Sequence, residues 1–350
     1  MPSPILVYGA YGYTGRLVVR EAVRRGVPLV VAGRDEARLR ALAAAYDLPG
    51  RVFGLSDGAR LVQELSAVAA VLHCAGPFVH TSDPMRRACL AAGTHYLDIT
   101  GEIPVFEAAY AQHDAAVAAG VVLLPGVGFD VVPSDCLAAK VAAACPGAVS
   151  LEIAFSGGAG PSRGTLRTMV EGLAAGLVVR RGGTLVERPF GSLERVVELR
   201  GRPRRVVAIP WGDVASAFRT TGIGDITVYA DLGRGTRPSA LRALGCAARL
   251  RAVRRILDGL AARARGPSDE ARARAPVALW ARCIGASGET ACGRATVPDG
   301  YDLTARTAVE AARRVAAGEV EPGAWTPAAA FGPDFLAGFE GVEVRVPAAC

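Results

Sequence analysis

Short apolar runs alternate with helical patterns along the first 125 residues, and this alternation restricts the fold more than any other feature of the sequence. The apolar runs cover residues 5–8, 29–32, 52–54, 71–74, 95–99 and 121–124. The segments with helical spacing cover residues 14–25, 36–46, 59–68, 83–92 and 105–119. Buried parallel strands read as continuous apolar runs, so the pattern predicts a doubly wound α/β domain over residues 1–133.

The pattern changes after Gly126 to a mixture of strands and helices separated by glycine and proline. Strands are expected over residues 150–155, 205–209, 225–230, 277–286 and 289–297, and helices over residues 134–145, 162–178 and 303–317. Residues 134–319 thus read as a second α+β domain, the substrate or catalytic domain, built on a mixed or antiparallel sheet. The tail, residues 320–350, is expected to pack back on the first domain.

Residues 237–275 form an arginine-rich helical insertion in this second domain. The residues expected to line its packed face are Leu241, Leu244, Val253, Leu257 and Leu260. The simpler interpretation is a solvated helix face with one packed side. The alternative is a docking surface for an acidic carrier protein or an anionic membrane.

Charge and cysteine content exclude several classes of protein. The formal net charge is +7, but arginines carry it along the whole chain and no recognition motif accompanies them, so we expect no nucleic-acid partner. The eight cysteines form no C-x-x-C pair and do not cluster with the four histidines, so we expect no metal site. Their apolar neighbours favour buried thiols in a reducing cytoplasm. We expect neither a secretory signal nor a transmembrane segment.

A glycine-rich turn lies between the first expected strand and the first expected helix. Its glycines follow the spacing G-x-x-G-x-x-G, and the turn consists of Gly9, Ala10, Tyr11, Gly12, Tyr13, Thr14 and Gly15. Glycines let the backbone approach a diphosphate, which then binds at the positive N-terminal end of the helix. In this strand-to-helix setting the turn predicts a dinucleotide site.

The end of the second strand should select between NAD and NADP. An acidic residue there would bind the ribose 2′-hydroxyl of NAD, whereas this strand ends in Gly33 and Arg34. A guanidinium at that position can pair with the 2′-phosphate of NADP. Asp35 follows directly and could also reach the ribose, but we interpret it as the N-cap of the next helix. The sequence therefore favours NADP(H).

Four ordered motifs within residues 9–135 resemble those of the saccharopine dehydrogenase-like oxidoreductases. They are G-A-Y-G-Y-T-G-R from Gly9, C-A-G-P-F from Cys74, Y-L-D-I-T-G-E from Tyr96 and G-F-D-V-V-P-S-D from Gly128. Among relatives in this family, the resemblance is nearest to the trans-acting enoyl reductases of lipid and polyketide pathways. True saccharopine reductases, which reduce an imine, are more distant. The resemblance implies the fold and the cofactor strongly and the substrate weakly.

Two residues depart from the family pattern. Tyr11 replaces the usual threonine, and we expect no effect from this change in a loop that binds through its backbone. Val131 replaces the usual serine, so any role of that hydroxyl does not carry over.

Ligands of doubly wound sheets bind at the carboxyl ends of the strands. The segment Cys74, Ala75, Gly76, Pro77 and Phe78 follows the fourth expected strand and should border the cofactor. Reduction with NADPH also needs a proton donor, and the candidates near strand ends are Asp98, Glu102, Asp130 and His80. Each has a structural alternative: Glu102 could cap a helix, Asp98 and Asp130 could hold loops, and His80 could be a polar loop residue. A solvent proton is a further alternative.

The leading hypothesis is NADPH-dependent reduction of a conjugated C=C bond in an enone or enoyl substrate of secondary or lipid metabolism, either free or bound to a carrier. No Tyr-x-x-x-Lys pair exists, because Cys136 precedes Lys140 by four residues, and this argues against ketone reduction by that pair. Gly158 belongs to a glycine-rich segment that should wall the substrate pocket, and Arg163 and Arg167 could bind a substrate carboxylate. The rivals are an imine reductase for an amino-acid-derived substrate and a non-catalytic NADP-binding protein. A homodimer is compatible with the sequence.

Overall fold

The computed structural model describes residues 3–233, 238–348 and 350. The chain divides into two compact units, each of which is described by itself. The first consists of Met1–Val132 and Tyr301–Phe331, and the second consists of Pro133–Gly300 and Gly332–Cys350.

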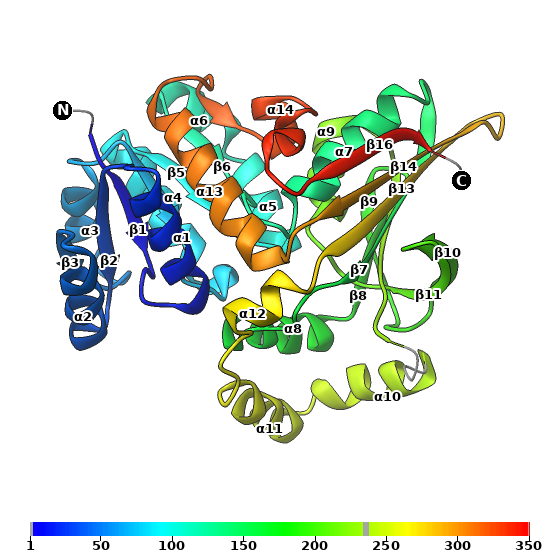
Figure 1. The fold of residues 1–350 in the computed structure, drawn as a ribbon, viewed down its shortest axis with the longest axis horizontal. Coiled ribbons are helices and arrows are strands. Elements are labelled where there is room, and N and C mark those ends of the chain that lie inside the picture. Colours follow the sequence, from blue (N-terminus) through cyan, green and yellow to red (C-terminus); the bar gives the residue numbers. More distant parts are fainter. Residues whose placement is uncertain (1–2, 234–237, 349) are drawn as a thin grey trace. The chain divides into compact units, whose positions relative to one another are not determined.

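The first unit contains a seven-stranded sheet whose neighbouring strands are all parallel. The strands are β1 (Ile5–Tyr8), β2 (Leu29–Gly33), β3 (Gly50–Val52), β4 (Ala70–His73), β5 (His95–Asp98), β6 (Val122–Leu124) and β15 (Gly323–Ala324). Their order, β15-β6-β5-β4-β1-β2-β3, is that of a dinucleotide-binding sheet with one added edge strand. The doubly wound parallel sheet expected from the alternating pattern is confirmed (Figure 1).

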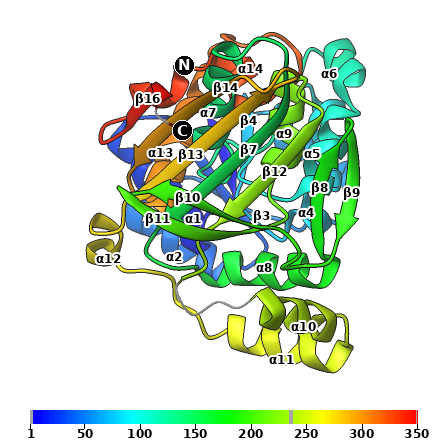
Figure 2. The ribbon, with the colours of Figure 1, turned by 90° about the vertical axis from the view of Figure 1, so that its right-hand side faces the viewer.

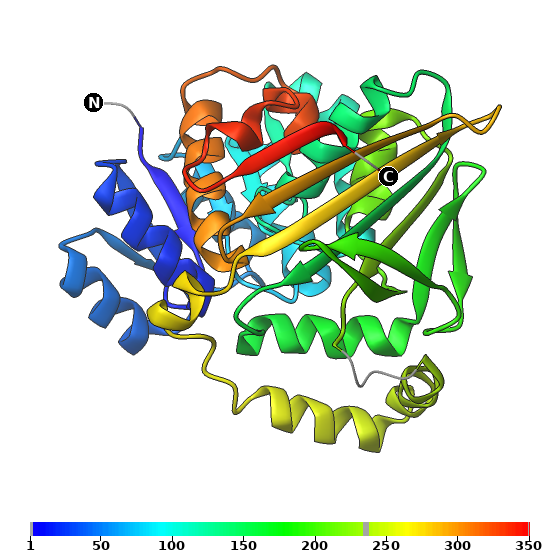
Figure 3. The same ribbon diagram turned by 45° about the vertical axis from the view of Figure 1, so that its right-hand side comes forward.

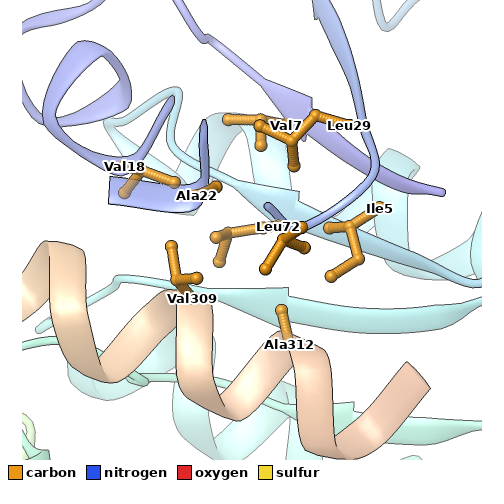
Figure 4. Close-up of a pocket in the computed structure, with 9 residues that line it drawn as sticks. Ile5, Val7, Val18, Ala22, Leu29, Leu72, Val309 and Ala312 are labelled. Atoms are coloured by element: carbon orange, nitrogen blue, oxygen red, sulfur yellow. The ribbon is translucent and has the colours of Figure 1, made fainter. Parts of the chain in front are cut away.

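Helices cover both faces of this sheet. They are α1 (Tyr13–Arg24), α2 (Glu36–Tyr46), α3 (Gly58–Leu65), α4 (Phe78–Ala92), α5 (Ile103–Tyr110), α6 (His113–Ala119), α13 (Gly300–Ala316) and α14 (Pro327–Phe331). Because side chains alternate along a strand, Leu6 and Tyr8 pack with α3 and α4, whereas Ile5 and Val7 face α1 and α13. Figure 4 shows the latter junction, where Val309 of α13 lies against the strands. The space there is too small for a water molecule, so it is core and no ligand site.

The second unit is built on a nine-stranded mixed sheet, as expected for residues after Gly126. Its strands are β7 (Ala148–Gly157), β8 (Leu177–Arg181), β9 (Thr184–Arg188), β10 (Glu194–Leu199), β11 (Arg202–Ala208), β12 (Asp225–Ala230), β13 (Val277–Gly285), β14 (Thr290–Val297) and β16 (Glu343–Ala348). β12 and β7 are parallel, and the other neighbouring strands are antiparallel. Figure 2 shows β12, β7, β13 and β14 side by side.

The helices of the second unit pack on this sheet and on one another. They are α7 (Val132–Ala143), α8 (Arg163–Ala175), α9 (Asp213–Thr221), α10 (Pro238–Ala248), α11 (Arg251–Ala261), α12 (Asp269–Ala273) and the 3-10 helix η1 (Phe335–Gly338). A Cβ on Gly293 of β14 would meet Val141 and Leu137, so this glycine lets α7 approach the sheet closely. The expected helical insertion corresponds to α10, α11 and α12. Its expected packed face is partly wrong, because Leu244 and Leu260 are exposed.

The two units divide the chain differently from the expected boundaries. The sequence predicts residues 301–319 in the second domain, but α13 supplies Val309 and Ala312 to the core of the first unit. The expected return of the tail to the first domain holds for β15, which pairs with β6. It does not hold for β16, which pairs with β14 in the second unit.

One cysteine pair departs from the expectation of free thiols. Pairing of β16 with β14 brings the Cα atoms of Cys292 and Cys350 to 5.3 Å, and the two residues form a disulfide. This contact joins residues that are 58 positions apart, so nothing in their local sequence indicated it. Cys89, Cys136, Cys145 and Cys283 are free and buried, whereas Cys246 is free and exposed.

Candidate dinucleotide and proton-donor site

The glycine-rich turn is packed so tightly that side chains are excluded at two of its glycines. Gly9 has a φ of 80°, and a Cβ there would lie 2.8 Å from the Cβ of Ala75. A Cβ on Gly15 would lie 2.3 Å from the carbonyl oxygen of Gly9. Gly9 therefore brings the turn against the segment after β4, and Gly15 brings α1 against the turn.

The N-terminus of α1 has the features of an anion-binding helix start. Gly12 occupies its N-cap position and supplies no side-chain hydrogen bond, and the first turn carries no acidic residue. The helix α2 shows the contrast, because its N-cap Asp35 accepts a hydrogen bond from the backbone N–H of Arg38 at 3.1 Å. Because no side chain accepts a hydrogen bond at this cap, the oxygens of a diphosphate can accept hydrogen bonds from the first N–H groups of α1.

Tyr11 connects this turn to the end of β2. A Cβ on Gly33 would lie 2.4 Å from the Tyr11 ring, so the ring lies directly on that glycine. The Tyr11 hydroxyl accepts a hydrogen bond from the Asp35 N–H at 3.1 Å, and the Tyr11 carbonyl accepts one from Arg38 at 3.2 Å. The Tyr11 side chain therefore forms part of the turn that follows β2, and the expectation that this residue is harmless to cofactor binding stays a prediction.

Two guanidinium groups lie beside this turn. Arg34 is exposed, and Arg38 is stacked over the Tyr11 ring with its Cζ 4.8 Å from the ring centroid. Asp35 is the N-cap of α2, as predicted, so its carboxylate is already bound to the backbone. The end of β2 thus presents positive side chains and an occupied carboxylate, which fits a 2′-phosphate better than a ribose 2′-hydroxyl.

A buried histidine organises the segment after β4. The Thr81 hydroxyl donates a hydrogen bond to the Ala75 carbonyl at 2.7 Å, and His73 Nε2 lies 3.0 Å from the same hydroxyl oxygen. This arrangement assigns the proton of the His73 ring to Nε2. Burial, aided by the positive charge of Arg86, lowers the pKa of His73 to about 3, so the ring stays neutral. His73 therefore positions the Ala75 backbone that lies against Gly9.

Glu102 directly precedes α5, but its side chain caps the N-terminus of α4. Its two carboxylate oxygens accept hydrogen bonds from the N–H groups of Phe78 and Val79, at 2.8 and 2.7 Å. These are the first two residues of α4, so the carboxylate binds the positive end of that helix. The structural alternative for Glu102, helix capping, is what the contacts show, and it applies to α4.

His80 lies in a helix and not in the loop that the sequence predicts. The sequence predicted a loop from Phe78 to Ser82 and a helix from Asp83, whereas α4 begins at Phe78. His80 therefore lies in the first turn of α4, and its side chain is exposed. The helix starts early because its cap comes from Glu102, 24 residues further along the chain.

Removing the Glu102 carboxylate should measure the value of this cap. Glu102→Ala leaves one buried and one partly buried N–H group without their acceptor, and we expect the free energy of unfolding to fall by about 3 kcal/mol. Denaturant unfolding would check this result. Glu36→Ala is the matched control, because Glu36 pairs with exposed Arg40 and its loss should cost less than about 1 kcal/mol. Equal effects of the two changes would contradict the capping role.

Asp98 is fully engaged in holding loops. Its Oδ1 accepts hydrogen bonds from the N–H groups of Thr100 at 3.0 Å and Gly126 at 2.9 Å. Its Oδ2 accepts a hydrogen bond from the Tyr96 hydroxyl at 2.7 Å. Burial raises the pKa of Asp98 although these three bonds oppose the shift. Asp98 joins the loops after β5 and β6, which supports its structural alternative over proton transfer.

Asp130 is the third candidate acid near the strand ends. It follows β6 at the carboxyl edge of the sheet, and a Cβ on Gly101 would lie 2.8 Å from its Oδ2. Burial, together with the negative charge of Glu102, raises the pKa of Asp130 to about 7. A carboxyl group with this pKa is partly protonated at neutral pH, as a general acid requires.

Two buried polar residues of this site were not among the predicted ones. His73 lies at the end of β4, and Arg86 of α4 is 1% exposed, with its guanidinium bound to Gln112 and Ser82. The sequence did carry a signal for His73, because it is a polar residue in an otherwise apolar strand run. Arg86 had no such signal, since an arginine between helical neighbours is usually solvated.

The predicted substrate residues lie in the second unit. Gly158 follows β7 with a φ of 94°, and the adjacent Ala159 N–H donates a hydrogen bond to Asp299 at 3.0 Å. Ser162 caps α8, whose first residue Arg163 is exposed, and Arg167 is half-buried one turn later. The structure thus fixes the loop around Gly158 and the start of α8, and their role in substrate binding stays a prediction.

The parallel sheet, its strand order and the uncapped glycine turn define a dinucleotide-binding domain of the doubly wound class. Residues 5–124 match the family model described as the saccharopine dehydrogenase NADP binding domain. Over these residues the first unit is similar to that NADP-binding domain, and the resemblance of its motifs to the saccharopine dehydrogenase-like oxidoreductases is confirmed.

Relatives of known name agree over the same part of the chain. A saccharopine dehydrogenase-like oxidoreductase of Bos taurus is 32% identical over 154 residues, which cover 38% of this chain and 36% of the relative. A putative trans-acting enoyl reductase of Mycobacterium tuberculosis is 35% identical over 140 residues, which cover 37% of this chain and 33% of the relative. The matched segment thus spans about a third of the length of these relatives.

The fold has a counterpart among solved structures. The apo saccharopine dehydrogenase (L-Glu forming) of Saccharomyces cerevisiae superposes with a TM-score of 0.63 and covers 99% of this chain and 100% of its own. The sequences are 14% identical, so this likeness concerns the fold alone.

Proposed function

We propose that the protein is an NADP(H)-dependent oxidoreductase that reduces a conjugated C=C bond in an enone or enoyl substrate. The observation that carries the proposal is the carboxyl group of Asp130, whose pKa is raised to about 7 at the edge of the sheet where a nicotinamide would bind. The similarity to a putative trans-acting enoyl reductase supports the choice of a C=C bond.

Different residues of the first unit bind the cofactor, donate the proton and position the backbone in the proposed reaction. Gly9, Gly12 and Gly15 hold a diphosphate against the start of α1, and Arg34 pairs with the 2′-phosphate. Bound NADPH supplies a hydride. Asp130 donates the balancing proton to the substrate and then recovers one from solvent, which its half-buried position allows. His73 and Glu102 act as positioning residues, since they fix the Ala75 backbone and the start of α4.

Imine reduction is the second candidate. It is supported by Arg167, which is half-buried on α8 and forms no ion pair within the part of the chain that the structure describes. A guanidinium of this kind suits the carboxylate of an amino-acid-derived substrate. A non-catalytic NADP-binding protein is the third candidate, and it would bind the cofactor without consuming it.

Oxidation of NADPH, followed by absorbance with a panel of enones, enoyl thioesters and imines, separates the three candidates. Consumption with enones or enoyl thioesters is the expected result. Consumption with imines alone would replace the proposal by its second candidate. Tight NADPH binding without turnover of any compound would favour the third, and failure to bind either dinucleotide would remove all three.

The cofactor preference rests on Arg34 and has its own test. Arg34→Ser should raise the Kd for NADPH about 10- to 100-fold and leave the Kd for NADH unchanged, because only NADPH carries the 2′-phosphate. Fluorescence titration with both dinucleotides measures this difference. Arg40→Ser is the matched control, since Arg40 lies on α2, the helix that follows Arg34, and pairs with Glu36. An equal loss for NADPH and NADH would contradict the assignment.

The cytoplasmic location and the homodimer stay predictions. The Cys292–Cys350 disulfide weakens the argument from reduced thiols, because disulfides are uncommon in reducing compartments. Among the described residues, no helix is long and apolar enough to cross a membrane.

A further inference from the structure

The helices α10 and α11 carry most of the excess positive charge of the protein. Residues 238–265 contain seven arginines and one acidic residue, Asp258, so they contribute +6 of the formal net charge of +7. Arg254 pairs with Glu171 of α8 at 3.9 Å. The other six arginines of this segment form no ion pair with any residue that the structure describes: Arg242, Arg249, Arg251, Arg255, Arg263 and Arg265.

The same two helices expose large apolar side chains. Leu250, Ile256 and Leu260 are 62%, 64% and 57% exposed, whereas Val253 and Leu257 are partly buried. Single exposed apolar residues need no explanation, but these three lie within eleven positions of the chain, and we refer to them as the apolar patch. The patch is a property of the helix pair and is not explained by packing in the second unit.

The arrangement on α11 places charge and apolar surface in adjacent rows. Arg251 and Arg255 are four residues apart and therefore lie in one row along the helix. Ile256 and Leu260 are also four apart and form the next row. The opposite side of the helix carries Val253, Leu257 and fully buried Ala261.

The helix pair is fastened to the second unit by its inner side. A Cβ on Gly245 of α10 would lie 3.3 Å from Phe190, and Arg254 of α11 reaches Glu171 of α8. Figures 1 and 3 show α10 and α11 lying along α8, on the side of α8 away from the mixed sheet. The rows of Arg251 and Ile256 are therefore presented on a supported, outward surface.

We propose that α10 and α11 dock the protein on an anionic membrane surface. Negative lipid headgroups would meet the unpaired arginines, while Leu250, Ile256 and Leu260 enter the boundary between headgroups and acyl chains. A bilayer suits the patch better than a protein partner, because mobile headgroups can neutralise arginines spread over two helices without a matching set of fixed carboxylates. This inference is independent of the reaction that the first unit performs.

Co-sedimentation with vesicles tests the proposal on the full chain with NADPH bound. We expect binding to vesicles containing about one third phosphatidylglycerol, little binding to pure phosphatidylcholine, and release when salt rises from about 0.1 M to about 0.5 M. Equal binding to both kinds of vesicle, or no binding to either, would overturn the proposal. Binding to purified acyl carrier protein, used as an acidic protein probe, without any binding to vesicles would also overturn the proposal.

Paired variants separate the two components of the surface. Arg251→Gln with Arg255→Gln should weaken partitioning into anionic vesicles about 30-fold, and Ile256→Ser with Leu260→Ser should weaken it at least about tenfold. Arg202→Gln with Arg345→Gln removes the same charge from exposed strand positions and should change partitioning less than about threefold. Melting temperatures and NADPH affinities establish that each variant is folded. Equal losses for the helix and strand arginine pairs would reduce the effect to net charge and overturn the assignment to α11.

Discussion

Gly9→Ala is expected to lower the affinity for NADPH at least about 100-fold. The new Cβ would lie 2.8 Å from Ala75 Cβ and 2.9 Å from the Ala75 nitrogen, and the residue would have to keep a φ of 80°. Either the turn or the segment after β4 must move, and both border the same diphosphate site. Isothermal titration with NADPH measures the loss directly.

The control for this change is another glycine-to-alanine substitution in the same unit. Gly58 is the first residue of α3, and a Cβ there meets nothing within 4 Å. Gly58→Ala should therefore leave the Kd for NADPH unchanged. If Gly9→Ala binds NADPH as tightly as Gly58→Ala does, the turn is not the diphosphate site. Far-UV circular dichroism shows whether each variant has kept the fold.

The second large effect is expected from Asp130→Asn. Loss of the proton donor should lower kcat about 10²- to 10⁴-fold while the Kd for NADPH stays unchanged. In the unsubstituted protein the acid must be protonated, so kcat should be constant below pH 7 and fall above it, since the pKa of Asp130 is about 7. Steady-state kinetics across this pH range should show the fall in the parent protein and not in the variant.

Two further variants distinguish chemistry from structure at Asp130. Asp114→Asn removes an exposed carboxylate from α6 and should leave kcat and its pH dependence intact. Gly101→Ala keeps the Asp130 carboxyl but places a Cβ 2.8 Å from its Oδ2, so it should lower kcat and shift the pH at which kcat falls. A parent-like profile for Asp130→Asn would rule out Asp130 as the acid.

The raised pKa of Asp130 also has a consequence that needs no substrate. The folded protein binds this proton more tightly than the unfolded chain, so ionisation of Asp130 opposes folding once the pH exceeds its ordinary pKa of 3.8. The destabilisation grows up to about pH 7 and is then complete. Asp130→Asn should therefore raise the Tm more at pH 8 than at pH 4, which differential scanning calorimetry can measure.

Local signals predicted those parts of the fold that local interactions decide. Asp35 caps α2, and Gly93 and Gly120 end α4 and α6 in the left-handed conformation, as their residue types indicate. The hairpin of β13 and β14 around Ser287 and Gly288 follows from apolar runs separated by a turn. The glycine turn could also be predicted, because its spacing and its place between strand and helix are both visible in the sequence.

Contacts between distant residues account for what the sequence did not show. The first turn of α4 exists because Glu102 caps it, and the hydroxyl of Tyr11 is occupied because the turn after β2 folds against it. Asp98, Glu102 and Asp130 looked alike as acids near strand ends. Only the surroundings separate them. Burial raises the pKa of both Asp98 and Asp130, but hydrogen bonds to Asp98 oppose its shift, whereas the negative charge of Glu102 adds to the shift of Asp130.

The return of α13 to the first unit has a consequence for biosynthesis. The part of the apolar cover of Ile5, Val7 and Leu72 that α13 supplies forms only when Val309 and Ala312 have been made, and Pro133–Gly300 must be translated before them. At about 5–20 residues per second, the α13 side of that sheet face stays uncovered for on the order of 10–30 s during synthesis. The nascent nucleotide domain should therefore be a client of chaperones that bind exposed β-strands. A gene fragment ending at Val132 should yield insoluble protein, unless the segment from Tyr301 to Phe331 is supplied.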